Sequence, residues 1–207
     1  MKKTAIFLIM IITTLCGNAQ TFSQWSSQEI EKANTAKNTN LSEQEKLVFL
    51  YCNLARLDGE KFAKTYAKNK LSGSSSYIVS LKKDLENTKN LPMLYPDQNL
   101  CYTAAYHAND MGKTGGVGHS STDGKSFSQR VRSYYNGGYI GENCSYGYSD
   151  AIDIVMQLLI DENTPSLGHR KNILRPDFKA MGVSIKPHKG YRFNCVQDFG
   201  DKIENPM

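Results

Sequence analysis

Two histidines and three carboxylates stand at positions in this sequence that could carry chemistry. His119 lies in "GHSS", Glu142 in "GEN" and His169 in "GHRKNIL", while Asp161 and Glu162 end an apolar stretch before the second histidine. Two imidazoles and two carboxylates can bind a divalent cation of the zinc type, or act as a set of acids and bases, if the fold brings them together. The spacing alone does not establish a site, because no two candidates lie one helical turn apart as they do in HExxH.

Each of these residues also has a purely structural interpretation. His119 follows three glycines, so it could be a loop residue that bonds a backbone carbonyl. Glu142 lies in a predicted strand, where an acid must face solvent or find a partner, since an unpaired buried carboxylate is costly. Asp161 could be a solvated helix end, and His169 could merely shape a turn. Near the N-terminus of a short helix over 170–174, however, the helix dipole would favour a neutral His169, the form that binds metal.

The other two histidines are interpreted as structural. His107 lies in an alanine-rich helix and His188 in a predicted hairpin turn, and neither has a glycine-flanked acidic neighbour. The sequence contains no GxSxG, Walker or GxGxxG motif, which removes the best-known serine-hydrolase and nucleotide-binding patterns.

Four cysteines follow the N-terminal segment, and their spacing is too wide for a zinc knuckle or a CxxC redox site. An even number in an exported chain favours two disulfides. We expect Cys52 to pair with Cys101, from two helices, and Cys144 with Cys195, from two strands. Four buried thiols are the alternative, because cysteine is among the most frequently buried residue types. A Cys/His nucleophile pair is disfavoured, since each cysteine has a plausible disulfide partner.

Residues 1–19 have the features of a secretory signal peptide. They combine a basic start, an apolar run over 5–15 that is too short to span a bilayer, and small residues just before the expected cleavage. We therefore expect an exported protein, secreted or periplasmic. A lipoprotein anchored through Cys16 is the alternative, disfavoured because Leu15 is a poor residue before a lipidated cysteine.

Removal of residues 1–19 leaves 188 residues, and the formal charge falls from +5 to +3 because two lysines leave with them. This length suits one domain, and so small a charge excess favours neither nucleic acid nor a polybasic membrane anchor as a partner. Residues 20–41 are expected to form a polar leader with at most one short helix. Residues 42–207 are expected to form the domain.

Sequence patterns predict helices around a small sheet. The capping box "SEQE" opens a helix over 43–57, and "PMLYP" should be extended. An α+β fold, or a three-layer sandwich with a small antiparallel sheet, is the resulting prediction. The remaining predicted elements are helices over 60–69, 77–86, 98–115, 127–135 and 151–161, and the strands "YIGENCSYGY", "MGVSIK" and "YRFNCVQDFG", the last two joined as a hairpin.

Taken in order, the motifs resemble those of the CAP family of secreted proteins, also called the SCP-like extracellular family, in its bacterial type. The resemblance covers about residues 43–200, and it is carried by "LVFLYCNLAR", "LYPDQNLCYTAAYHANDM", "GHSS", "GENCSYGYSDAIDIV", "GHRKNIL" and "MGVSI". It implies an α-β-α sandwich with a cleft lined by two histidines and two acids.

The resemblance implies that His119 and His169 are the two histidines and Glu142 the first acid. Ahead of the second histidine the family often has a tryptophan motif, whereas this chain reads "QLLIDENTPSLGHR". Aligning Leu158 with the tryptophan places Asp161 on the second acid, and Glu162 is the alternative. An aspartate there is one methylene shorter than the usual glutamate and reaches about 1.5 Å less far.

Members of the family are associated with sterol or lipid binding, protein partners, metal-assisted functions and, in a few cases, proposed proteolysis, so the resemblance implies no single reaction. The leading hypothesis is an exported binding module whose cleft holds a divalent metal, zinc by preference, and whose partner is an extracellular protein, a lipid or a small ligand. One alternative is a metal-assisted hydrolase in which His119 and His169 hold zinc and a water while Glu142 is the general base. Another is a purely structural polar cluster, with protein or lipid binding elsewhere on the surface.

Overall fold

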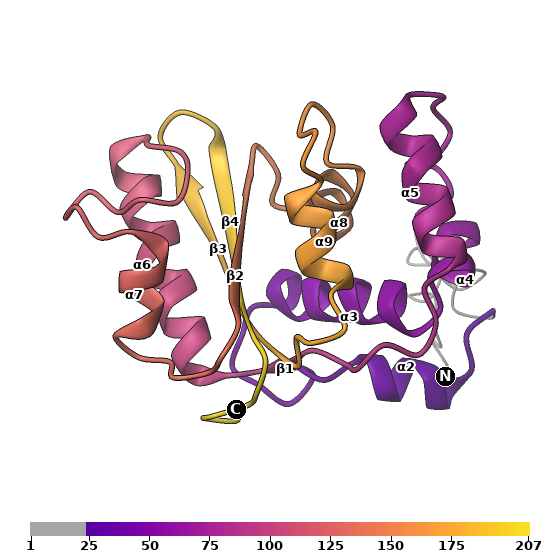
Figure 1. Ribbon diagram of the computed structural model, residues 1–207, viewed down its shortest axis with the longest axis horizontal. Coiled ribbons are helices and arrows are strands. Elements are labelled where there is room, and N and C mark those ends of the chain that lie inside the picture. Colours follow the sequence, from indigo (N-terminus) through magenta and orange to yellow (C-terminus); the bar gives the residue numbers. More distant parts are fainter. Residues whose placement is uncertain (1–23) are drawn as a thin grey trace, which may run out of the picture.

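The structure is a computed structural model that describes residues 24–207 (Figure 1). The predicted signal peptide over 1–19 and the alternative lipid attachment at Cys16 lie outside the described residues. Among those described, no helix is long and apolar enough to cross a membrane. In chain order the elements are α2 (Ser27–Ala33), α3 (Glu43–Leu57), α4 (Gly59–Lys64), α5 (Ser76–Glu86), β1 (Tyr95–Pro96), α6 (Gln98–Thr114), α7 (Phe127–Arg132), β2 (Ile140–Tyr146), α8 (Ala151–Ile160), α9 (Gly168–Leu174), β3 (Ala180–His188) and β4 (Arg192–Gly200).

Four strands form one mixed sheet in the order β1-β3-β4-β2. The strands β3 and β4 pair antiparallel as the predicted hairpin, and β2 pairs antiparallel with the other side of β4. The segment predicted to be extended supplies β1, whose two residues, Tyr95 and Pro96, pair parallel with β3. The antiparallel arrangement is therefore confirmed for the three long strands, and the sheet becomes mixed only through this short edge strand.

Helices cover both faces of the sheet, which confirms the predicted α-β-α sandwich. In Figure 1, α6 and α7 lie to the left of the strands, and α3, α8 and α9 lie to the right. The main core lies on the α3 and α8 side and includes Phe49, Leu54, Ile154 and Phe199. Two smaller clusters fill the α6 side, one of them around Leu100.

The helix α6 lies directly on β3 because a glycine faces it. A Cβ atom added to Gly182 would stand 2.0 Å from the carbonyl carbon of Leu100, far inside van der Waals contact. The small side chains of Ala104 and Ala108 on the same helix are also fully buried against the sheet. Any larger residue at position 182 would push α6, and the loop that follows it, away from the strands.

The helix α3 begins at the predicted capping box and runs over Glu43–Leu57 as expected. Two buried polar residues in its second half bind the backbone of segments that lie far apart in the sequence. Asn53 Nδ2 donates to the carbonyls of Ala33 and Leu94 at 2.9 and 3.0 Å. The buried guanidinium of Arg56 donates to four backbone carbonyls, those of Pro92, Ile173, Arg175 and Phe178.

The described part of the leader, residues 24–41, lies against the domain. Its tryptophan, Trp25, is only 4% exposed, and its Nε1 donates to Thr65 Oγ1 at 3.1 Å. The short helix α2 follows, and Glu29 in its first turn accepts from Lys61 Nζ of α4 through both oxygens, at 2.7 and 2.8 Å. Because Lys61 also lies 4.5 Å from the centre of the Trp25 ring, one cation holds two points of the leader.

Two helices end earlier than the sequence predicts. The stretch predicted over 60–69 forms α4 only as far as Lys64, because the Thr65 hydroxyl bonds the carbonyl of Lys61 and turns follow. The stretch predicted over 127–135 forms α7 only to Arg132, after which turns carry Tyr135 into the core, where its hydroxyl donates to the carbonyl of Lys202.

The prediction of two disulfides is wrong, because Cys52, Cys101, Cys144 and Cys195 are all buried free thiols. In the β2–β4 register Cys144 pairs with Val196, one position away from Cys195. Since successive side chains of a strand point to opposite faces, these two thiols face opposite sides of the sheet. Cys52 of α3 and Cys101 of α6 are separated in the same way, because their helices cover opposite faces (Figure 1).

Candidate functional site

His119 stands in the loop that joins α6 to α7. Gly115, at φ 80°, ends α6, and Gly118, at φ 98°, directly precedes the histidine. Both angles lie in the region that glycine adopts without strain, so these two residues let the chain turn back over the edge of β2. The glycines that the sequence shows before His119 therefore shape the loop that presents it.

Glu142 of β2 holds the ring of His119. The ring Nδ1 lies 2.8 Å from Glu142 Oε1, and the carboxylate side chain is only 1% exposed. Arg130 of α7 bonds the other oxygen, Oε2, and also donates to Ser121 Oγ at 2.8 Å and to the carbonyl of His119 at 3.2 Å. Burial raises the pKa of the Glu142 carboxyl, but the hydrogen bond from His119 and the charge of Arg130 outweigh it, so the pKa lies below its usual value. Glu142 is therefore a buried carboxylate with both oxygens engaged.

Asp161 holds the ring of His169. It is the C-cap residue of α8 and adopts a left-handed conformation, with φ 56° and ψ 40°. Its Oδ1 lies 2.7 Å from His169 Nδ1, while its Oδ2 accepts from the backbone nitrogens of His169 and Arg170 at 2.9 and 3.3 Å. Glu162, the alternative second acid, is exposed. The shorter acid reaches the histidine because its own backbone conformation turns it toward the first turn of α9.

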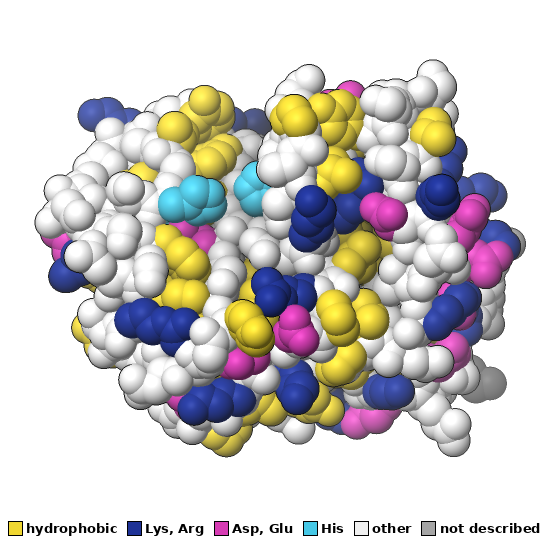
Figure 2. Space-filling view, viewed as in Figure 1, with side chains coloured by type: hydrophobic (Ala, Val, Ile, Leu, Met, Phe, Trp, Pro, Cys, Tyr) yellow, Lys and Arg dark blue, Asp and Glu magenta, His cyan; other side chains and the backbone are white. Residues whose placement is uncertain are grey.

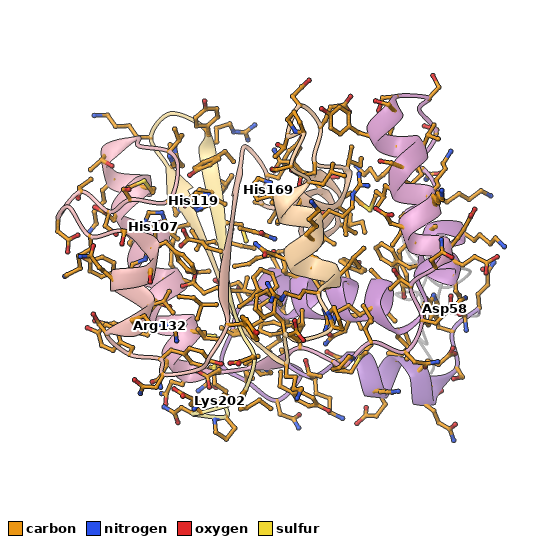
Figure 3. All side chains as sticks on the ribbon, viewed as in Figure 1. Asp58, His107, His119, Arg132, His169 and Lys202 are labelled. Atoms are coloured by element: carbon orange, nitrogen blue, oxygen red, sulfur yellow. The ribbon has the colours of Figure 1, made fainter. Side chains whose placement is uncertain are left out.

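Both histidines are thus anchored in the same way. An ionised carboxylate only accepts hydrogen bonds, so each ring donates Nδ1–H to its acid, and in the neutral ring Nε2 carries the free lone pair. The side chain of His119 is 53% exposed and that of His169 is 25% exposed. Figure 3 places the two on either side of β2, and Figure 2 shows two histidine side chains close together on this face of the molecule. The sequence-predicted set of two histidines and two acids is therefore assembled in space, with Asp161 as the second acid.

A bridge of amides connects the two halves of the site. Asn143, the last residue of "GEN", donates from Nδ2 to the carbonyl of His169 at 3.1 Å. Asn172 donates from its own Nδ2 to Asn143 Oδ1 at 2.9 Å and to the carbonyl of Glu142 at 3.2 Å. A shift of α9 relative to β2 would break these bonds, so the distance between the two histidines is fixed by the fold.

Sequence reasoning missed two residues of this arrangement. Arg130 gave no signal, since an arginine in the last turn of a short helix is most simply solvated. Asn172 lies inside the quoted motif "GHRKNIL" but was given no role. The motif itself could have pointed to Asn172, because this polar amide directly precedes Ile173, which is fully buried.

A cavity of about 460 Å³ opens beside His169. It borders Cys144 of β2 and Asp161, and residues of α8 such as Met156 and Leu158 form its apolar part. His119 is not part of its wall, so the cavity extends from one histidine only. The remaining lining residues are Lys70, Tyr148, Asp153, Gln157, Ile160, Glu162 and Thr164.

A second group of potential metal ligands lies in the interior behind His119. One nitrogen of His107, the Cys144 sulfur and a Glu142 oxygen all lie within 4.8 Å of one another, and all three residues are buried. His107 bonds the carbonyl of Gly118 through Nε2 at 2.8 Å. Burial lowers the pKa of His107 and raises that of the Cys144 thiol well above its usual value, so both groups are neutral in the protein alone. Sequence reasoning interpreted His107 as structural, and nothing in its helical context pointed to this group.

Comparison with known proteins gives structural relatives of low identity. An extracellular protein containing an SCP domain from Bacillus anthracis is 26% identical, with a TM-score of 0.48, and the match covers 61% of this chain and 39% of that one. An outer surface protein of Borrelia burgdorferi is 21% identical over 66% of this chain and 90% of its own, with a TM-score of 0.47. The venom allergen-like protein 4 of Schistosoma mansoni is 15% identical over 81% and 95%, with a TM-score of 0.46. No curated protein matches the chain.

A match of the amino-acid sequence identifies the family of this chain. Residues 51–199, more than half of the chain, match the family described as the cysteine-rich secretory protein family, or CAP. This range contains all four residues of the histidine and acid set and the whole of the sheet apart from the last residue of β4. The chain therefore belongs to the CAP family.

Proposed function

We propose that this protein is an exported binding module whose cleft takes up a divalent cation of the zinc type between His119 and His169. The observation that carries the proposal is the matched anchoring of the two rings, each of which gives Nδ1 to a buried carboxylate, at 2.8 and 2.7 Å. A histidine that binds metal almost always donates its other ring nitrogen to a carboxylate, a carbonyl or a water. The two acids fix the tautomer in which Nε2 is available as a ligand.

The donor set fits zinc better than magnesium or calcium. Imidazole nitrogen is a preferred ligand of zinc, whereas magnesium and calcium select oxygen donors. Glu142 and Asp161 place their oxygens on the rings, on Arg130 and on the backbone of α9, so at the cleft they orient the two histidines. Two nitrogens leave further coordination positions open, which suits a site completed by water or by a group from a partner. A cation bound there would supply a Lewis-acidic centre at the surface.

Export is supported by the signal-peptide pattern of residues 1–19, which is independent of the site. The relatives from Bacillus anthracis and Borrelia burgdorferi are described as extracellular and outer surface proteins. An extracellular protein, a lipid or a small ligand is the partner class that this setting and the family suggest, and nucleic acid is not expected given the small charge excess.

Zinc titration by calorimetry tests the proposal. The wild-type protein should bind zinc at the cleft, and the double variant His119→Ala, His169→Ala should lose that binding step. The variant Glu162→Gln is the matched control, because Glu162 borders the same cavity and is exposed. Equal zinc affinity in the wild type and the double variant would remove the cleft site. If His119→Ala instead lowers the melting temperature while zinc binding is unchanged, the cluster is architectural.

A second candidate function is a metal-assisted hydrolase that uses the same cleft. The cavity of about 460 Å³ beside His169 favours it, because a substrate needs a volume of this kind next to the metal. Glu142 is a poor general base in this structure, since its side chain is 1% exposed and both oxygens are engaged. Hydrolysis of a peptide or ester library by the zinc-loaded wild type, lost in the double histidine variant, would establish the enzyme; binding of zinc without turnover supports the binding module.

A further inference from the structure

We propose that the interior group formed by His107, Cys144 and Glu142 is a second cation site, distinct from the cleft, that takes a zinc-type transition metal through a thiolate. The site would use one ring nitrogen of His107, Sγ of Cys144 and a carboxylate oxygen of Glu142. It does not depend on zinc being bound at His119 and His169, although Glu142 belongs to both arrangements.

The first support is the state of His107. His107 is fully buried, and its Nε2 donates to the carbonyl of Gly118 at 2.8 Å. The lone pair of the neutral ring therefore lies on Nδ1. Within residues 24–207 this buried Nδ1 atom has no hydrogen-bond partner. A buried acceptor without a donor is costly, so natural structures rarely leave one unmatched unless a water or an ion occupies the space beside it.

The second support is that the groups around the His107 ring are metal ligands. The Cys144 sulfur makes only distant contacts, 3.5 Å to the carbonyl of Gly118 and 3.8 Å to His119 Nδ1. Glu142 is ionised and can offer a lone pair beyond those that it gives to His119 and Arg130. Imidazole, thiolate and carboxylate together select zinc, cobalt or a similar metal over magnesium and calcium.

The distances require only a small adjustment. With zinc bonds of about 2.0–2.3 Å, the ligand atoms of a tetrahedral site lie about 3.5 Å apart. The three atoms here lie within 4.8 Å of one another, so side-chain rotations of the order of 1 Å would close the site. A water can fill the fourth position, and Asp198 Oδ1, another buried atom without a partner, lies on the residue paired with Glu142 in the sheet.

The charges balance when the metal enters. Cys144 loses its thiol proton to the buffer as the metal–sulfur bond forms, while His107 and Glu142 bind without losing a proton. The thiolate and the carboxylate then neutralise the cation, although Arg130 opposes it by its own charge.

A buried water is the competing occupant. Arg130 Nε and Asn194 Oδ1 are also buried without a hydrogen-bond partner, and a water could satisfy some of these atoms together. Water and metal differ in one decisive respect, since only a metal binds the Cys144 sulfur as a thiolate.

Cobalt(II) titration of the reduced protein distinguishes the two occupants, because thiolate-bound cobalt has an intense near-ultraviolet charge-transfer absorption that histidine-bound cobalt lacks. The wild type should develop this band and saturate at one thiolate site per chain. Cys144→Ser should abolish the band, and Cys52→Ser, which changes another buried free thiol, should retain it. His107→Gln, whose amide can still donate to Gly118, should weaken cobalt binding at this site at least tenfold.

The double variant His119→Ala, His169→Ala separates this site from the cleft. It should retain the thiolate band while it loses the zinc-binding step of the cleft in the calorimeter, so the two proposals can fail independently. Absence of the band in the wild type at saturating cobalt, or its persistence in Cys144→Ser, would overturn the interior site and leave water as the occupant. Circular dichroism of each variant checks that the fold is intact, and absence of the band in the wild type would overturn the interior site even if a variant does not fold.

Discussion

Asp161 binds His169 through both of its carboxylate oxygens: Oδ1 lies 2.7 Å from the ring Nδ1, and Oδ2 lies 2.9 Å from the backbone nitrogen of the same residue. One side chain therefore fixes the tautomer of the imidazole and the start of the helix that carries it. The left-handed backbone of Asp161 makes this possible, because it turns a short acid back toward α9.

Replacing Asp161 by asparagine should weaken zinc binding by about 10–100-fold, the usual cost of losing a hydrogen-bonding partner of a metal ligand. An amide presents one oxygen and one NH₂ group, so it cannot accept from the ring and the backbone at the same time. Calorimetric titration with zinc measures the effect. Glu162→Gln changes the neighbouring acid, which is exposed, and should bind zinc like the wild type. Equal losses in the two variants would contradict the assignment of Asp161.

Replacing Arg130 by methionine should destabilise the protein by about 3–5 kcal/mol, because it leaves the Glu142 carboxylate buried without its charged partner. Urea denaturation measures the free energy of unfolding. Arg132→Met is the matched control: Arg132 lies on the same helix but is exposed, and it bonds only two glycine carbonyls. Its loss should cost no more than about 1 kcal/mol. Similar costs for the two variants would show that the buried pair does not hold the loop.

Replacing Glu29 by glutamine should remove a pH-dependent contribution to stability. The hydrogen bond from Lys61 is the main cause that lowers the pKa of Glu29 from 4.5 to about 2, so this contribution is present above pH 4.5 and is lost as the pH falls toward 2. The melting temperature of Glu29→Gln should lie below that of the wild type at neutral pH, and the difference should shrink between pH 4.5 and 2. Glu31→Gln, in the same helix, is the control. A difference that is independent of pH would mean that Lys61 does not anchor the leader through this carboxylate.

In the chain that lacks residues 1–19, four thiols should react with a thiol reagent when the protein is unfolded in denaturant without any reductant, since Cys52, Cys101, Cys144 and Cys195 are free. In the native protein the reaction should be slow, because all four are buried and burial raises their pKa values. A count of zero or two thiols in denaturant would show that disulfides form after all.

The sequence was sufficient where local signals decide the structure. The capping box at Ser42 and Glu45 predicted α3 to the residue, and the alternation of β3 and β4 around a turn predicted their hairpin. The order of short motifs predicted that His119, Glu142 and His169 belong together, and in the structure Glu142 of β2 bonds His119 while the neighbouring Asn143 bonds the backbone of His169.

The sequence could not predict features that depend on contacts between elements far apart in the chain. The choice between Asp161 and Glu162 depends on a left-handed residue at the end of α8, which a non-glycine residue adopts only when the tertiary structure requires it. The cysteine pairing failed because the one-residue offset between Cys144 and Cys195 in the strand register is not visible before the strands are paired. Arg130 was missed because its partner Glu142 lies on a different element, and only packing brings the two together.

A crystal structure of the protein soaked with zinc, with diffraction data collected at the zinc absorption edge, tests the proposed cleft site most directly. We expect an anomalous peak within about 2.0–2.1 Å of Nε2 of both His119 and His169, with each Nδ1 still bonded to its acid. A peak at only one of the two rings, or none between them at zinc concentrations that saturate the calorimetric titration, would contradict a cleft that binds metal through this pair.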